Sequence, residues 1–304
     1  MMSEFTSKPY SLVPEASLIE TLPEHQRKRF VKALDLMHED IGEAISWEEI
    51  ATRSAISPFH FHRQFTQLFH ETPGHYLGRI RLQHAVSMLF ENQELSVTDI
   101  AQYCGFSSSQ ALAKALKRDL SMTAKAIRKL GNDGSADDIA DLFDKLAHKD
   151  GNDESIENQL AENMPCRVTH FPQRAIKTRV LPDVDFETLC EKLGAKMLDL
   201  VFVTPIKDLD KSWSDDNHQA GAWVAPSQAD PEHDIHIKAG HFICAEVYVT
   251  SDIGYVAALD GIYYYAEKYG LEINPDGQCL EQLKDIEWTS TGGVVMSMQV
   301  SILS

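Results

Sequence analysis

The chain has 304 residues, of which 43% are hydrophobic and 24% charged, and its formal net charge at pH 7 is −18. A chain of this length normally forms two domains, each with its own core. It holds no run of 18 apolar residues and its start lacks a signal-peptide pattern, so neither a membrane span nor secretion is expected. Five cysteines without a CxxC pair favour reduced thiols, and we therefore expect a cytoplasmic protein.

The negative charge is distributed unevenly along the chain. Residues 1–24 carry −3, with one Lys against four Glu, and residues 25–130 carry +3, with 14 Lys and Arg against 11 Asp and Glu. Residues 131–304 carry −18, with 13 basic against 31 acidic residues. Binding to phosphate depends on the local basic face and not on the total charge. The middle segment is therefore compatible with DNA binding, whereas the acidic remainder suits a domain that faces a ligand or a partner.

Composition and periodicity divide the chain into four parts. Residues 1–23 are polar, contain three prolines and are expected to form a loosely held arm. A helical pattern covers residues 24–130, and an α+β pattern covers residues 165–304. Between them, residues 131–164 form an acidic, flexible linker with one short amphipathic helix that needs a partner surface. That helix is predicted from four apolar residues at helical spacing: Ile139, Leu142, Phe143 and Leu146.

One helix-turn-helix pattern occurs twice in the basic segment, at about residues 46–69 and 96–120. The offset between the copies is 50 up to the serine that follows each turn and 51 afterwards. The offset of 51 aligns four residues of the first copy with four of the second: Phe61, Arg63, Phe65 and Phe69 match Leu112, Lys114, Leu116 and Leu120. Repetition of both the caps and the core positions indicates a duplicated DNA-reading unit.

Polar residues mark where the helices of the two copies begin. Ser46 with Glu49, and Ser96 with Asp99, form capping pairs at the first helices. Ser57 before a proline starts the second helix of the first copy. Between the copies, apolar spacing predicts one long helix over residues 73–91, which would set the separation and phase of the two units.

The outer faces of the second helices supply the candidate DNA contacts. Arg pairs with guanine edges, Gln with adenine, and an aromatic or small apolar side chain with the thymine methyl group. The candidates for base contacts are Phe59, His62, Arg63 and Gln67 in the first unit and Ser109, Gln110 and Lys114 in the second. Basic residues better suited to phosphate contacts are Arg27, Lys28, Arg29, Arg79, Arg81, Lys117, Arg118, Lys125, Arg128 and Lys129. The alternative is that these residues form the solvated faces of a helical interaction domain. Duplication of the motif argues against this alternative.

The stretch from Ile45 to Leu130, above all residues 57–65 and 99–108, resembles the AraC/XylS family of bacterial transcription regulators. The resemblance implies seven helices in two subdomains, with both recognition helices entering successive segments of the major groove. By motif position it implies that Phe59, His62 and Arg63 read bases in the first unit, and that Ser109, Gln110 and Lys114 do so in the second.

The second unit departs from the family pattern. Lys114 stands where members usually have Arg, Leu116 and Leu120 stand where they have Phe, and residues 123–124 lack the usual Pro. Lysine is a point charge without the planar fork of arginine. We therefore expect the first unit to read bases and the second mainly to hold the DNA backbone.

The C-terminal part alternates short strand and helix patterns. Helices are predicted over residues 185–200 and 253–269. The strands are predicted over residues 168–171, 175–181, 220–224, 235–237, 241–250 and 294–302. This spacing suits a two-layer antiparallel sheet with helices on one face.

Placing an α+β domain after the DNA-binding domain resembles the Rob-type regulators, which carry a GyrI-like, SHS2-type effector-binding domain. Residues 240–248, 262–265 and 277–281 carry this resemblance. It implies a pseudo-duplicated βαββ unit around an apolar cleft for cationic or aromatic ligands, with Glu281 as the carboxylate of the cleft. The following Gln282-Leu283 departs from the usual aromatic residue.

A carboxylate beside aromatic rings can hold an organic cation. The candidate ligand-binding residues are Glu281, Trp223, Tyr248, Tyr263 and Trp288, with Trp213 as a further ring. Because burial alone would raise the pKa of the carboxyl, we expect Glu281 to be solvent-accessible or hydrogen-bonded. The alternative, in which the rings are core and Glu281 lies on the surface, stays open.

No catalytic, metal or cofactor pattern stands out. His218, His233, His236, His241 and Cys244 fit no compact zinc ligand set, and there is no nucleotide-binding loop or nucleophile motif. We expect neither an enzyme nor a cofactor.

The leading interpretation is a bacterial transcription regulator that binds double-stranded DNA and is modulated by a small molecule or protein at its C-terminal domain. RNA polymerase is a further candidate partner. Two alternatives remain: a ligand-binding or sequestration protein, and a GyrI-like hydrolase, each tethered to DNA. The operator, the effector, the direction of control and the oligomeric state are not predicted.

Overall fold

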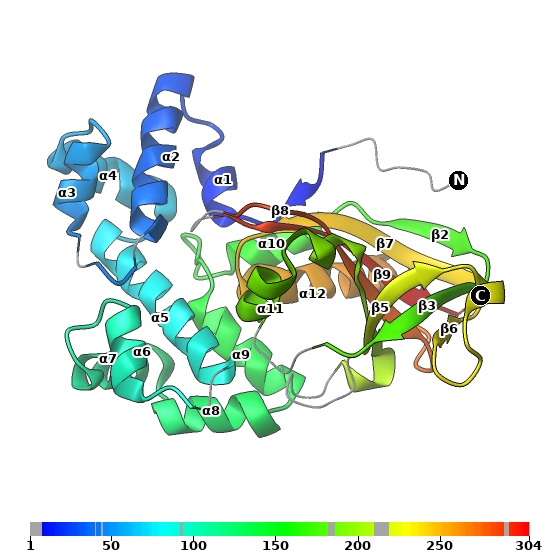
Figure 1. The fold of residues 1–304 in the computed structure, drawn as a ribbon. Helices are drawn as coiled ribbons and strands as arrows, with labels where there is room; N and C mark the ends of the chain where they lie inside the picture. The colour runs from blue at the N-terminus through cyan, green and yellow to red at the C-terminus, as the bar shows by residue number, and fades with distance from the viewer. Residues whose placement is uncertain are drawn as a thin grey trace. The chain divides into compact units, whose positions relative to one another are not determined.

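The computed structural model describes residues 8–39, 41–43, 45–91, 94–181, 186–209, 219–288 and 292–303 (Figure 1). The chain divides into two compact units. The helical unit covers residues 13–157, and the sheet unit combines residues 8–12 with the chain from residue 158 onward.

The helical unit contains both predicted helix-turn-helix motifs. Its elements are α1 (Pro14–Ile19), α2 (Glu24–Glu39), α3 (Trp47–Arg53), α4 (Pro58–Phe69), α5 (Pro73–Glu91), α6 (Val97–Tyr103), α7 (Ser109–Ala115), the π-helical turn η1 (Leu116–Leu120), α8 (Ala124–Asp133) and α9 (Ala136–Leu146), and α10 (Ile156–Glu162) begins at its end. The long helix predicted over residues 73–91 is confirmed as α5.

Helix α5 contacts both motifs through its side chains. At its beginning the ring of Tyr76 lies 5.3 Å from that of Phe65 and 5.8 Å from that of Phe69, both in α4. Near its end the thiol of Cys104 in the second motif points at the sulfur of Met88, 3.8 Å away. Burial of each large apolar side chain stabilises the fold by about 2 kcal/mol. The two motifs are therefore packed on one rigid element.

Both motifs turn between their helices through a left-handed residue, Ala55 at φ 56° and Gly105 at φ 70°. An alanine tolerates this conformation at some cost, but the second turn is more restricted. A Cβ atom on Gly105 would lie 2.2 Å from the carbonyl oxygen of Ile41. Glycine at this position is therefore required by conformation and by space.

The amphipathic helix predicted in the linker is α9, and it has the partner surface that its composition requires. Ser135 and Asp138 form a capping box at its start, and the ring of Phe143 lies 5.9 Å from that of Phe90 in α5. His148 beyond it is fully buried. The predicted boundaries at residues 130 and 164 stay predictions, but the compact helical unit extends to residue 157. Residues 136–148 therefore pack as part of the helical unit, which differs from the flexible linker expected from their acidic composition.

The sheet unit contains the predicted α+β pattern. Its helical elements are α11 (Phe186–Leu193), α12 (Asp252–Tyr269) and the short turns η2 (Gly194–Asp199), η3 (Ile206–Asp208) and η4 (Pro226–Gln228). Its strands are β1 (Tyr10–Ser11), β2 (Arg167–Phe171), β3 (Arg174–Arg179), β4 (Val201–Pro205), β5 (Gln219–Val224), β6 (Ile235–Ile237), β7 (Gly240–Val249), β8 (Gln278–Ile286) and β9 (Val294–Ile302). They form one sheet in the order β1-β7-β9-β8-β4-β5-β3-β6, with β2 also paired to β7.

Six strands and the helix α12 lie where the sequence predicts them, and every pairing except that of β1 with β7 is antiparallel. Strands β4 and β8 were not predicted. The helix predicted over residues 185–200 ends at Leu193, because Gly194 adopts φ 52° and the chain continues as a 3-10 turn.

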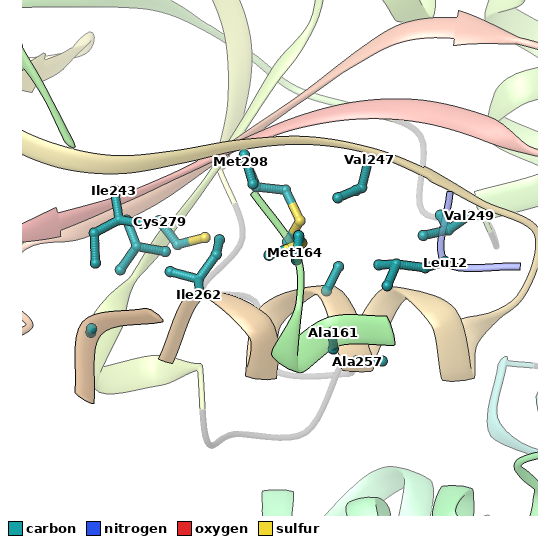
Figure 2. Packing of buried hydrophobic residues seen from close by; sticks show 14 of the residues in the cluster. Leu12, Ala161, Met164, Ile243, Val247, Val249, Ala257, Ile262, Cys279 and Met298 are labelled. Atoms are coloured by element: carbon teal, nitrogen blue, oxygen red, sulfur yellow. The ribbon is translucent and has the colours of Figure 1, made fainter. Parts of the chain in front are cut away.

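Helix α12 packs on one face of the sheet, as the two-layer prediction requires (Figure 2). Ala257 and Ile262 of the helix are buried against Ile243, Cys279 and Met298 of the strands. This layer is the main hydrophobic core of the sheet unit.

Residues 10–19 differ from the loosely held arm expected at the N-terminus. Tyr10 and Ser11 pair in parallel with Val247 and Tyr248, and Leu12 and Ile19 are only 1% and 4% exposed. Apolar side chains hold this segment where its polar composition suggested a free arm.

We expect Gly105→Ala to lower the free energy of unfolding of the helical unit by about 2–4 kcal/mol, because the new Cβ is strained and meets Ile41. Gly78→Ala in α5 is the matched control, since nothing lies within 4 Å of its Cβ position and helix propensity predicts a gain of about 0.5–1 kcal/mol. Urea unfolding followed by circular dichroism measures both. Equal effects of the two substitutions on the free energy of unfolding would contradict the close approach of residue 105 to the Ile41 carbonyl.

Candidate functional site

Helix α4 is positioned by its cap and by its buried face. The hydroxyl of Ser57 accepts a hydrogen bond from the backbone N–H of His60 at 3.4 Å, and Pro58 is the first helical residue. Phe61, Phe65 and Phe69 are fully buried, as their spacing predicts. The opposite face of α4 is thereby directed outward.

That outward face carries the four candidate base contacts of the first unit. Phe59 is 73% exposed, Arg63 and Gln67 are exposed, and His62 is half-buried. The ring of His62 lies 5.2 Å from that of Trp47. Together with Trp47 and Thr66, the four candidates line an open hollow of about 570 Å³. The hollow combines a cation, an amide and an apolar ring, which are the groups that read base edges.

The second unit has a shorter recognition helix. Its N-cap is Ser108, whose hydroxyl accepts from the N–H of Ala111 at 3.1 Å, which places the cap at the offset of 51. Leu112 and Leu116 are buried, Gln110 and Lys114 are exposed, and Ser109 is half-buried. After Ala115 the α-helix gives way to a π-helical turn.

The π-helical turn carries two exposed basic residues. The Nζ of Lys117 donates to the carbonyl of Ser121 at 3.3 Å. The guanidinium of Arg118 donates to both carboxylate oxygens of Asp119, at 2.6 and 2.7 Å. Asp119 thus neutralises Arg118 locally, whereas Lys117 keeps donors for a phosphate.

The assignment of Arg79 to phosphate contacts is wrong. Its side chain is buried, and its Nη2 donates to Glu71 at 2.7 Å while its Nη1 donates to the carbonyl of Leu146 at 3.2 Å. Arg81 and Arg128 are half-buried and donate to the carbonyls of Glu43 and Leu95. The remaining exposed candidates are Arg27, Lys28, Arg29, Lys125 and Lys129.

His148 joins the same buried network, which sequence analysis missed. Its Nδ1 lies 3.0 Å from Nη2 of Arg79, and its Nε2 lies 3.0 Å from the carbonyl of Phe69, the last residue of α4. Because arginine only donates, Nδ1 accepts and Nε2 carries the proton. Burial, and next the charge of Arg79, lower the pKa of His148. A neutral histidine thus ties the end of the first recognition helix to α5.

In the sheet unit, Glu281 is buried, and the alternative that it lies on the surface is wrong. Burial raises the pKa of its carboxyl to about 7, although a hydrogen bond from Tyr255 opposes the rise. Its Oε1 has no hydrogen-bond partner. The structure therefore presents a buried, partly satisfied carboxyl group, with Tyr255 as a neighbour that the sequence did not single out.

The other candidate ligand residues are dispersed. The indole Nε1 of Trp223 donates to Oε1 of Gln282 at 3.4 Å, and Gln282 faces the side of the sheet opposite Glu281. Tyr248 donates to Glu287 at 2.7 Å. Tyr263 and Trp288 are 38% and 58% exposed. Trp213 and His218 lie outside the described residues.

In the described part of the chain, no helix combines the length and the apolar character needed to cross a membrane. Within the same residues, no three His, Cys, Asp or Glu side chains are grouped so as to hold a metal ion. All five cysteines are free thiols.

Comparison with known proteins bears on the helical unit. Residues 50–130 match the helix-turn-helix domain family. This stretch is a helix-turn-helix domain. The chain is 34% identical over 123 residues to the HTH-type transcriptional activator RhaS of Escherichia coli O157:H7, across 40% of this chain and 43% of RhaS. The chain thus spans less than half the length of this relative. RhaS is named as a transcriptional activator.

Two solved structures match about a third of the chain. An AraC-type DNA-binding regulator from Chromobacterium violaceum is 25% identical, with a TM-score of 0.33, over 36% of this chain and 96% of that one. The DNA-binding domain of AdpA, solved with a target DNA, is 30% identical, with a TM-score of 0.31, over 32% of this chain and 87% of that one.

The buried carboxyl of Glu281 predicts a pH-dependent stability. Its pKa is raised in the folded state, so its contribution to stability is present below the unfolded-state pKa and is lost as the pH rises through about 7. Glu281→Gln removes this loss, and we expect the variant to gain up to about 3 kcal/mol over the wild type between pH 5 and pH 9. Hydrogen exchange of the β8 and β9 amides at each pH measures this difference in the free energy of unfolding.

The control for this experiment is Glu272→Gln, because Glu272 is exposed and its substitution should leave the pH profile of those amides unchanged. A pH profile of Glu281→Gln that follows the wild type would contradict the burial of an ionisable carboxyl.

Proposed function

We propose that the chain is a cytoplasmic, sequence-specific transcription regulator of the AraC/XylS type, whose sheet unit binds a small molecule or a protein that modulates DNA binding. The observation that carries the proposal is the outward face of α4, where Phe59, His62, Arg63 and Gln67 line one open hollow. The helix-turn-helix match over residues 50–130 supports it.

In the first unit, these four side chains would read bases. Arg63 supplies a planar fork for guanine, Gln67 an amide for adenine, and Phe59 an apolar ring for a thymine methyl group. Exposure of the Phe59 ring to water is unfavourable in the free protein, so its burial against a base would favour binding. His62 is held beside Trp47 and would complete the hollow.

In the second unit, Ser109, Gln110 and Lys114 would lie in the next groove segment, with Lys117 on a phosphate. Lys114 has no bidentate fork, and Asp119 occupies the fork of Arg118. We therefore assign this unit mainly to the DNA backbone. Two units in one chain suffice to bind adjacent grooves without dimerisation, and RNA polymerase is the partner through which a bound regulator would act.

The effector site is proposed at Glu281, in the manner of a GyrI-like domain. An organic cation would give the unpartnered Oε1 an opposite charge and would thereby lower the pKa of the carboxyl. Tyr255 would orient the carboxylate, and Tyr248, Tyr263 and Trp288 stay candidate rings, whereas Trp223 packs on the other face of the sheet. The effector transmits a signal only if its affinity differs between DNA-competent and incompetent arrangements.

DNA recognition is tested with the fragment that the purified protein captures from a genome and with a scrambled fragment. Arg63→Ala should lower discrimination between the two by about 1–3 kcal/mol, because a base contact is lost. Lys129→Ala is the matched control, because Lys129 is an exposed candidate for a phosphate contact. It should weaken binding to both fragments alike and reduce the slope of log affinity against log salt concentration by about 1.

Titration by fluorescence anisotropy at several salt concentrations separates these effects. Equal wild-type affinity for captured and scrambled DNA would refute the regulator proposal.

The effector site is tested separately with benzyltrimethylammonium as the probe. We expect this cation to raise the Tm of the sheet unit, and its affinity to fall about tenfold per pH unit below pH 7, because protonation removes the charge of Glu281. Glu281→Gln should abolish the shift and Glu272→Gln should retain it. A shift that survives in Glu281→Gln would place the cation elsewhere.

A further inference from the structure

The face of the sheet opposite α12 has an unusual composition. Ile243 and Val247 of β7 pack in the core beneath α12, so the alternate residues Cys244 and Glu246 face the other way. Their partners on β9 are Gln299 and Ser297. This second face, which we call the cationic face, has its own buried apolar cluster, which includes Ile176, Val203 and Leu280, and beside it charged, amide and aromatic side chains.

Arg174 lies at the centre of the cationic face. Its guanidinium carbon is 4.0 Å from the ring centroid of Phe171, 4.8 Å from that of Phe242 and 5.0 Å from that of Trp223. Its Nη1 donates to Oε1 of Gln299 at 2.8 Å. Arg174 is on β3, and three strands, β8, β4 and β5, lie between β3 and β9 in the sheet. The sheet therefore curves so that both strands border one aromatic enclosure.

Two donors of Arg174 have no acceptor. Its Nε and Nη2 are shielded from solvent and make no hydrogen bond. These two nitrogens form the side-on edge of the guanidinium, which pairs with both oxygens of a carboxylate. Aromatic faces attract a cation, but they do not replace two directed hydrogen bonds. A buried guanidinium edge without acceptors is unfavourable, and burial also lowers the pKa of Arg174 to about 10.

The charges around Arg174 also favour an anion. Arg167 pairs across the strands with Cys244, and the Nζ of Lys284 donates to Oε1 of Gln282 at 2.8 Å. Glu246 interacts with both of these cations. Two further carboxylates lie on this face at the Tyr248 end of β7: Asp285 pairs with Val295, the partner of Tyr248, and Glu287 accepts from the Tyr248 hydroxyl. The face therefore carries both signs of charge, with the carboxylates at the Tyr248 end of β7 and Arg174 at the Phe242 end.

We propose that the cationic face binds a small organic carboxylate with an aromatic body. The carboxylate accepts from Nε and Nη2 of Arg174, and the ring of the ligand packs among Phe171, Trp223 and Phe242. A bare phosphate fits less well, because it is strongly hydrated and gains nothing from three aromatic rings.

The ligand reaches the two donors only when the Arg174 side chain or one ring moves aside, since both nitrogens are shielded. Trp223 is half-buried and already hydrogen-bonded to Gln282, so its fluorescence reports such a movement. This site is on the opposite face from Glu281 and rests neither on DNA binding nor on the cation proposed there.

The experiment titrates the full chain with benzoate and phenylacetate, and measures Tm and tryptophan fluorescence. We expect saturable stabilisation at millimolar concentrations by both acids, and none by benzamide or inorganic phosphate. Arg174→Lys, which keeps the charge but loses the fork, should weaken binding at least about tenfold. Arg179→Gln, at the exposed end of the same strand, should bind as the wild type does.

Trp223→Phe keeps an aromatic ring and should retain the Tm shift while the fluorescence change is lost. Circular dichroism of Arg174→Lys verifies its fold, so that lost binding is not lost structure. The proposal is overturned if neither acid binds, if phosphate or benzamide binds as tightly, or if folded Arg174→Lys keeps the wild-type affinity. The Glu281 and Arg63 experiments have independent outcomes.

Discussion

Packing of α5 against both helix-turn-helix motifs is the constraint on which the proposed DNA recognition depends. One helix of 19 residues contacts the first motif through Tyr76 and the second through Met88. Because an α-helix has a fixed rise and rotation per residue, the recognition helices α4 and α7 are held at one separation and one phase. Without this element, two short motifs would bind DNA independently and their contacts would not reinforce each other.

The buried network of Glu71, Arg79 and His148 gives the helical unit a second connection. Charges in an interior are unfavourable unless they are paired and hydrogen-bonded, and here each group has a partner. The network joins the end of α4, the long helix α5 and the chain after α9. The acidic segment beyond the helix-turn-helix domain therefore contributes to the position of the first recognition helix.

The two faces of the sheet have different chemistry because strand residues alternate. The α12 face is lined mainly by aliphatic side chains and contains the buried carboxyl of Glu281. The opposite face holds Arg174 within three aromatic rings. A carboxyl whose pKa is raised and a guanidinium with two unpaired donors favour ligands of opposite charge. One sheet can in this way offer two distinct binding surfaces.

Local signals in the sequence were enough for the caps at Ser46, Ser57 and Ser96, for the bounds of α5 and for most strands, because these depend on neighbouring residues. The sequence pattern also placed Phe59 and Arg63 on the outer face of α4. Tertiary structure alone decided that Arg79 is buried, since its partners Leu146 and His148 lie almost 70 residues away. Tertiary structure also placed Trp223 beside Arg174 and away from Glu281. The curvature of a sheet arises from pairings between distant strands, so neighbouring residues in the sequence do not predict it.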